Sequence, residues 1–156
     1  MALVAASCLF LAAMVHAAIT DFRRHRMLNV TVIALAVAYL PMAMAVGLDW
    51  MTIVSAIVAT LLVFVIGFGA FCANWVGGGD IKLATVTTLW IGAEMVLPFL
   101  LLAGLFGLVL SVLFRVMQRW QTGAAPDGRE IPYSPGIVLA GFALFSSSQW
   151  FTGTSF

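Results

Sequence analysis

Long apolar runs separated by short polar stretches make up most of this chain. The runs cover residues 2–19, 27–46, 51–71, 81–91, 95–114 and 137–145, with an extension of the last one towards residue 151. A helix needs about 20 apolar residues to cross the hydrocarbon core of a bilayer. Four of the runs approach this length, whereas those at 81–91 and 137–145 are shorter. The pattern predicts an all-α, polytopic membrane helical bundle with about six transmembrane helices.

The basic residues are confined to alternate polar stretches. All seven lie in or beside the stretches after the first, third and fifth runs: Arg23, Arg24, Arg26, Lys82, Arg115, Arg119 and Arg129. The only charged residues of the other two stretches are Asp49 and Glu94. Because Lys and Arg stay on the cytoplasmic side of a membrane, this segregation predicts that both termini lie outside the cytoplasm.

The composition agrees with a lipid surrounding. The chain is 63% hydrophobic and 8% charged, whereas a soluble domain is about half apolar and about a quarter charged. A net charge of +1 offers no concentrated basic face for a nucleic acid. Cys8 and Cys72 lack the spacing of metal ligands or of a disulfide framework. We expect one membrane-embedded domain over residues 1–156, in contact with the bilayer and without a metal or other cofactor.

Two carboxylates stand out, because ionisable residues at a membrane are costly and mark function or pair with each other. Asp21 ends the first run and Asp80 begins the fourth, so the predicted topology puts both on the cytoplasmic face. Two adjacent carboxylates can share one proton, so that one activates water while the other protonates a peptide carbonyl. The alternative is structural: Asp80 favours a helix N-terminus, and Asp21 pairs with nearby arginines.

Three glycines, Gly77, Gly78 and Gly79, directly precede Asp80. Glycine permits unusual backbone angles and leaves no side chain to block close approach. A run of this kind suits the alignment of an extended substrate beside the carboxylates. A flexible turn between two helices is the alternative interpretation.

Residues 77–83, Gly-Gly-Gly-Asp-Ile-Lys-Leu, resemble the Gly-x-Gly-Asp-x-Lys-Leu motif of type IV prepilin peptidases. In that family this Asp is one catalytic carboxylate. The other is an Asp at the end of the first helix, followed by a basic stretch and Ile-Pro-Asn. Asp21 is followed at similar spacing by Asn29, with Met27 and Leu28 in place of Ile and Pro. The resemblance therefore implies that Asp21 and Asp80 are the catalytic pair.

The resemblance covers nearly the whole chain, since residues 131–133, Ile-Pro-Tyr, are similar to the start of the family's last helix. It implies an aspartyl endopeptidase of the bacterial inner membrane that acts near the cytoplasmic face on prepilin or pseudopilin substrates. Long family members carry Cys-x-x-Cys pairs in a segment associated with N-methylation. This chain lacks such pairs, so it resembles the short form that serves Flp or tight-adherence pili, and no N-methyltransferase segment is expected.

Further residues are expected to support the pair. The glycine run would align the substrate, and Asn29 would support Asp21 or a helix end. Lys82 belongs to the motif, but two residues along a helix it points away from Asp80. It would then act at the lipid headgroups or against another group.

His16 lies about one helical turn before Asp21. It would either tune that carboxylate or take part in a structural hydrogen bond with Thr20.

Other functions remain open at this point. An intramembrane protease that cleaves other signal or membrane helices also carries a Gly-x-Gly-Asp motif. A proton-coupled small transporter would use membrane-level carboxylates as a relay, although no internal repeat is evident. A non-catalytic assembly subunit would tolerate the loss of both carboxylates.

Overall fold

The computed structural model describes residues 1–24, 29–122 and 134–152, and these are almost entirely helical. The main helices are α1 (Ala2–Arg24), α2 (Asn29–Val46), α3 (Trp50–Cys72), α4 (Gly78–Ile91), α5 (Val96–Thr122) and α6 (Ser134–Phe145). A short 3-10 helix, η1 (Ala93–Met95), precedes α5, and α7 (Gln149–Thr152) follows α6. No strand occurs in these ranges. The predicted all-α membrane bundle is confirmed.

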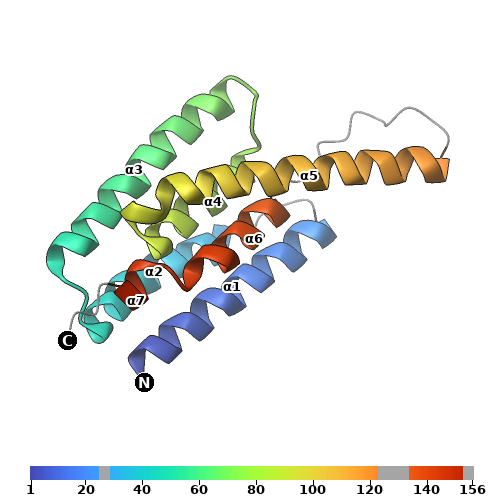
Figure 1. The fold of residues 1–156 in the computed structure, drawn as a ribbon. Helices are drawn as coiled ribbons and strands as arrows, with labels where there is room; N and C mark the ends of the chain where they lie inside the picture. Colours follow the sequence, from blue (N-terminus) through green and yellow to red (C-terminus); the bar gives the residue numbers. More distant parts are fainter. Residues whose placement is uncertain (25–28, 123–133, 153–156) are drawn as a thin grey trace.

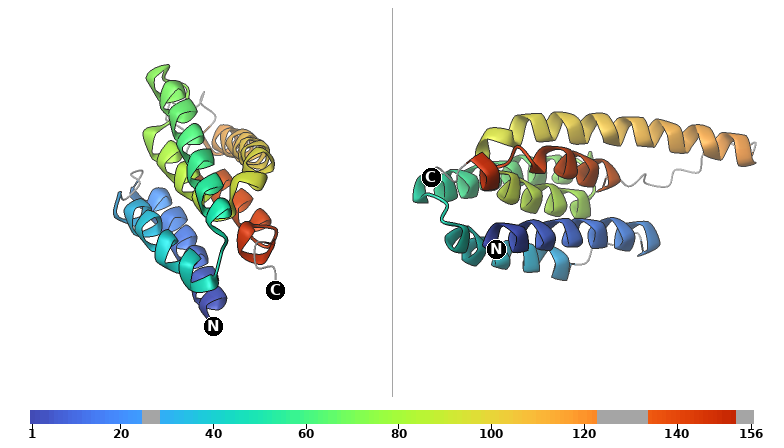
Figure 2. Two further views of the ribbon diagram at one scale, coloured as in Figure 1. Left: turned by 90° about the vertical axis from the view of Figure 1, so that its left-hand side faces the viewer. Right: turned by 60° about the horizontal axis from the view of Figure 1, so that its bottom comes forward.

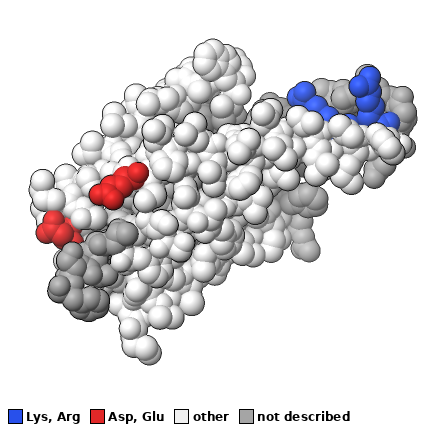
Figure 3. Space-filling model, viewed as in Figure 1, with Lys and Arg blue, Asp and Glu red and all other residues white. Residues whose placement is uncertain are grey.

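Consecutive helices run in opposite directions, so helix starts and helix ends alternate at each end of the bundle (Figure 1). We call one end the basic end, because it carries Lys82, Arg115 and Arg119. The opposite end carries Asp49 and Glu94, and we call it the acidic end. Figure 3 shows basic side chains at the far end of α5 and acidic ones at the other extremity. Among the residues that the structure describes, the charge segregation expected from the sequence is therefore present in space.

The helices fall into two length classes. Four stretches are long and apolar enough to cross a membrane, by length and composition: Ala2–Thr20, Asn29–Val46, Trp50–Cys72 and Ala93–Met117. The other two helices, α4 and α6, have 14 and 12 residues. They are therefore about 21 Å and about 18 Å long, against a hydrocarbon core of about 30 Å. They correspond to the two short apolar runs of the sequence, at 81–91 and 137–145.

The two short helices occupy the middle of the bundle. α4 packs against α2, α3 and α6, while α6 packs against α1, α4 and α5. Figure 2 shows α1 and α2 on one side of the molecule and α5 on the opposite side. Because the bundle shields α4 from lipid, this helix can carry buried hydroxyls. Those of Thr87 and Thr88, both 0% exposed, donate to the carbonyls of Leu83 and Ala84 at 2.8 and 2.9 Å.

Aromatic side chains from several helices fix the depth of α4. Trp90 stacks on Phe10 of α1 and on Trp150 of α7, with ring centroids 5.4 and 5.0 Å apart. Its indole N–H donates to the carbonyl of Leu35 in α2 at 3.0 Å. The indole of Trp150 donates to the carbonyl of Trp90 at 2.6 Å. These directional bonds hold the last turn of α4, and therefore also set the level of its first turn at the basic end.

Candidate active site

One face of α1 is buried from residue 6 to residue 17. Ala6, Phe10, Met14 and Ala17 are each at most 1% exposed and follow one another at helical spacing. The next position in this series is 21, about one turn beyond Ala17. Position 21 therefore continues this series along the backbone of α1, which extends to Arg24. The side chain of Asp21 is outside the described part of the chain, so this placement rests on the helix backbone.

Asp80 lies in the first turn of α4, as its third residue, and is partly buried. Gly77 is the N-cap residue, with extended backbone angles of φ −68° and ψ 140°. The free N–H groups and the dipole of a helix start favour a negative charge. The interpretation of Asp80 as a favourable helix N-terminal charge is therefore correct.

Thr87 and Met14 define the register of α4 against α1. The hydroxyl of Thr87 donates to the sulfur of Met14 at 3.7 Å. Asp21 lies seven residues after Met14 and Asp80 seven residues before Thr87, on helices of opposite direction. Seven residues make about two turns, or about 10 Å, and return to the same helix face. The backbone thus brings the two Asp positions to a similar depth on facing sides of α1 and α4.

The glycine run leaves space beside Asp80. A Cβ atom at Gly77 would lie 3.3 Å from Oδ2 of Asp80, and one at Gly78 would lie 3.2 Å from the ring of Phe71. The run does not use the unusual backbone angles that glycine permits. Gly77 has an ordinary φ of −68°, while Gly78 and Gly79 are helical. Close packing, and not conformational freedom, is what disfavours a side chain at the first two positions.

Lys82 and Asn29, which belong to two separate sequence motifs, meet at the basic end. Nζ of Lys82 donates to Oδ1 of Asn29 at 3.0 Å. Asn29 is the first residue of α2, and Lys82 is the fifth residue of α4. Two residues correspond to about 200° around a helix, so Lys82 points away from the Asp80 side, as expected. The hydrogen bond joins the segment after Asp21 to the segment that carries Asp80.

The sequence also matches a known protein family. A family model described as the type IV leader peptidase family matches residues 8–112. The matched stretch contains Asp21, Asn29 and residues 77–83. The chain belongs to this family. No curated protein and no solved structure matches it.

Membership of the type IV leader peptidase family makes this protein a peptidase, and its long apolar helices make it a multi-pass membrane protein. The third sequence motif, at residues 131–133, lies outside both the matched stretch and the described residues. Residues 77–83 lie wholly in the described part of the chain, whereas Met27 and Leu28 of the first Asp-containing motif lie outside it.

His16 of this leader peptidase is exposed and lies on another side of α1 from Asp21, since five residues correspond to about 140° around the helix. The hydroxyl of Thr20 donates to the backbone carbonyls of His16 and Ala17 at 2.8 and 3.0 Å. The expected structural hydrogen bond between His16 and Thr20 is therefore present, but it uses the backbone of His16 and not its ring.

Gln149 forms a buried hydrogen-bonding centre that the sequence patterns did not predict. This side chain is 7% exposed. Its Nε2 donates to the hydroxyl of Tyr39 and to the carbonyl of Leu89, both at 3.0 Å. A polar residue that interrupts an apolar run at membrane depth needs such partners. The polar residues that interrupt the last apolar run were therefore the sequence signal for this centre. Gln149 connects α7 to α2 and α4 at the acidic end, far from Asp80.

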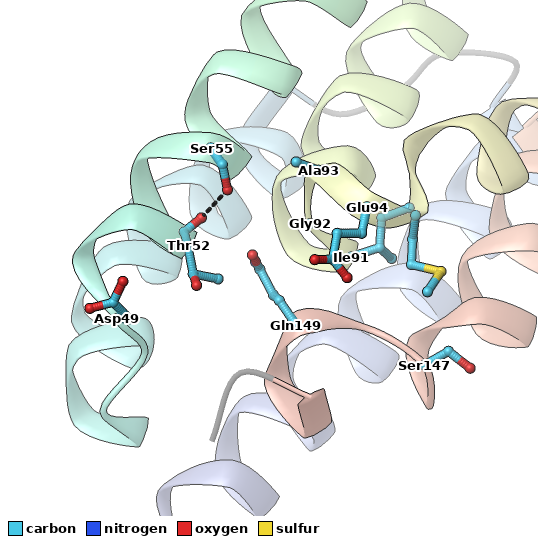
Figure 4. Close-up of a pocket in the computed structure, with 10 residues that line it drawn as sticks. Asp49, Thr52, Ser55, Ile91, Gly92, Ala93, Glu94, Ser147 and Gln149 are labelled. Atoms are coloured by element: carbon cyan, nitrogen blue, oxygen red, sulfur yellow. Dashed lines mark hydrogen bonds between the residues drawn. The ribbon is translucent and has the colours of Figure 1, made fainter. Parts of the chain in front are cut away.

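A cleft of about 530 Å³ opens at the acidic end of the leader peptidase (Figure 4). Its lining includes Asp49 and Thr52 of the α3 start, Glu94 of η1 and Gln149 of α7. Because Asp80 lies at the opposite end of α4, this cleft takes no part in the candidate site. Among the described residues, no three or more His, Cys, Asp or Glu side chains are grouped to hold a metal ion.

Proposed function

We propose that this leader peptidase is an aspartyl endopeptidase that removes the leader peptide from Flp-like type IV prepilins or pseudopilins, with Asp21 and Asp80 as its catalytic pair. The observation that carries the proposal is the register of α1 and α4. The contact between Met14 and Thr87 lies about two turns from both Asp positions, on the same helix faces. Both positions also fall inside the stretch matched by the family.

In the proposed reaction the two carboxylates hold one proton between them. Asp80, whose ionised form is favoured at the start of α4, takes a proton from a water molecule as the water oxygen attacks the scissile carbonyl carbon. Asp21 gives its proton to the carbonyl oxygen, which produces a tetrahedral diol. When the C–N bond breaks, Asp80 passes its proton to the leaving nitrogen, and Asp21 recovers a proton from the collapsing diol.

The proposed location is the bacterial inner membrane, with the basic end towards the cytoplasm. Support comes from Lys82, Arg115 and Arg119 at this end, because cytoplasmic loops retain basic residues. The start of α4 then lies near the cytoplasmic surface, where a leader peptide can reach it. The space beside Asp80 at Gly77 suits an extended substrate backbone.

Mass spectrometry of a candidate Flp-like prepilin incubated with the purified enzyme in detergent tests this function. The wild-type protein is expected to cut once, at the end of the leader. Asp21→Asn and Asp80→Asn preserve shape but remove the acid–base chemistry, so each is expected to lower the cleavage rate by at least about 10²–10⁴-fold. Near-normal cleavage by either variant, once it is shown to insert and fold, would sink the paired mechanism. Cleavage of unrelated membrane helices but not of the prepilin would point to a broader intramembrane protease.

A further inference from the structure

The hydrogen bond between Lys82 and Asn29 connects the two chain segments that carry the proposed catalytic pair. Lys82 lies two residues after Asp80, and Asn29, the first residue of α2, lies eight residues after Asp21. The donor–acceptor distance is 3.0 Å, in the normal range for a charged donor. The bond therefore spans from α2 to α4 close in sequence to both Asp positions.

The packing of Lys82 directs its ammonium group towards Asn29. Its side chain lines a cavity of about 140 Å³ between α2, α3 and α4, together with Val32, Phe64 and Leu89. An apolar lining accommodates the methylene stem of a lysine while its charged head reaches the surface, and both Lys82 and Asn29 are exposed. The first residue of α2 supplies a polar partner there, so the lysine acts as a link between two helices.

The described contacts between α1 and α4 themselves lie further from the carboxylates. Phe10 stacks on Trp90, with centroids 5.4 Å apart, and Met14 meets Thr87 at 3.7 Å. Both contacts are made by side chains, and the nearer one is about two turns from the Asp positions. A link from the start of α2 to the first turn of α4 can therefore restrain the helix ends where these contacts do not.

We propose that Lys82 and Asn29 are positioning residues for the catalytic pair. Their hydrogen bond holds the start of α2 against the first turn of α4, and α1 packs along α2. This contact sets the separation of Asp21 and Asp80. The effect on catalysis rests on the proposed function, whereas the effect on the separation does not.

Disulfide trapping tests the separation without any need for catalysis. The parent for this test is the variant Asp21→Cys/Asp80→Cys, with the native exposed thiols of Cys8 and Cys72 removed by substitution to alanine. The rate of disulfide formation under a mild oxidant then reports how closely the two positions approach.

Two substitutions at Lys82 separate the lost bond from lost packing. Lys82→Met keeps an unbranched stem in the cavity but removes the donor, whereas Lys82→Arg keeps a donor. With Lys82→Met the trapping rate is expected to fall about four- to fivefold, less than for a buried charge-assisted hydrogen bond, because Lys82 and Asn29 are exposed to solvent. With Lys82→Arg it is expected to stay within about twofold of the parent. Asn29→Leu and Asn29→Asp provide the same contrast on the acceptor side.

Prepilin cleavage by these variants, with both Asp residues present, tests the catalytic consequence. Lys82→Met and Asn29→Leu are expected to lower kcat about tenfold with KM nearly unchanged, because positioning acts on the reacting groups and not on substrate binding. The double variant is expected to be no slower than the slower single variant, because both changes remove the same bond. Lys82→Arg and Asn29→Asp are expected to retain activity, and thermal unfolding provides the control for folding.

The outcomes distinguish the inference from the function on which it rests. Unchanged trapping with Lys82→Met overturns the inference, whatever happens to kcat, and so does a parent variant that forms no disulfide. Slower trapping with Lys82→Met, together with a wild-type protein that cleaves no prepilin, supports the link between the helices and overturns the proposed function. Slower trapping together with a lower kcat supports both.

Discussion

The hydroxyl of Thr87 lies 3.7 Å from the sulfur of Met14, and this contact sets α4 against α1 about two helical turns from the Asp positions. On another side, Thr87 is close to α6, since a Cβ atom at Gly141 would lie 3.1 Å from its methyl group. Thr87 is 0% exposed, so it has little freedom to move. A change of volume here should therefore alter the spacing of the carboxylates without touching them.

Thr87→Leu is expected to force α1 and α4 apart at this contact. Overpacking of a closed site costs about 1–3 kcal/mol, and the shift in register should lower kcat for prepilin cleavage. Thr87→Val is the matched control, because it keeps the branched shape and loses only the hydroxyl, at about 1 kcal/mol. Thermal unfolding and cleavage rates measure the two effects. A Leu variant with a lowered unfolding midpoint and an unchanged kcat would show that the register does not control the site.

Gly77→Ala is expected to impair catalysis more than stability. The φ of Gly77, −68°, is accessible to alanine, but the added methyl group would lie 3.3 Å from Oδ2 of Asp80 and would displace the carboxylate slightly. Displacements below 1 Å can reduce a rate by about 10-fold or more. Gly104→Ala in α5 is the control, since its Cβ atom meets nothing within 4 Å, and it should leave both rate and stability nearly unchanged. Equal cleavage rates for the two variants would contradict the crowding argument.

The length of the apolar runs was sufficient to predict the helices but not all of their ends. The run at 51–71 became α3, Trp50–Cys72, because hydrophobic length and the membrane set the same limits. The helix α1 instead continues to Arg24, and α5 continues to Thr122. Charged residues can extend a helix into water, where hydropathy no longer marks its end. Asp21 therefore lies inside a helix and not at its end.

The candidate site was predictable as a set of residues but not as a set of contacts. Asp21, Asp80, Lys82 and Asn29 were all identified from their motifs. The bond between Lys82 and Asn29 joins residues 53 positions apart, so it depends on how α2 and α4 pack. The partners of Gln149 likewise belong to other helices. Spacing along one chain segment carries no information about such pairings.

Thiol labelling should establish which end of the bundle faces the cytoplasm. Cys72 ends α3 near the basic end and is exposed, whereas Glu94 lies in η1 at the acidic end. In spheroplasts, an impermeant maleimide is expected to label Glu94→Cys directly and to reach Cys72 only after permeabilisation, because the basic end should face the cytoplasm. Cys8 is replaced by alanine in both proteins, so that it does not react with the maleimide. The reverse order of labelling would invert the proposed orientation.

Two glycines with positive φ angles separate backbone strain from side-chain crowding. Gly47 has φ +84° and open space around its Cβ position, whereas Gly92 has φ +90° and a Cβ position 2.8 Å from Oε1 of Gln149. Alanine at either site should lose about 1–3 kcal/mol of stability from backbone strain. Gly92→Ala should lose a further 1–3 kcal/mol or so, because a displaced Gln149 leaves its buried bonds to Tyr39 and Leu89 unmade. Unfolding of both variants in detergent, monitored by circular dichroism, measures the difference. Equal losses would mean that the Gln149 bonds contribute little to holding α7 on the bundle.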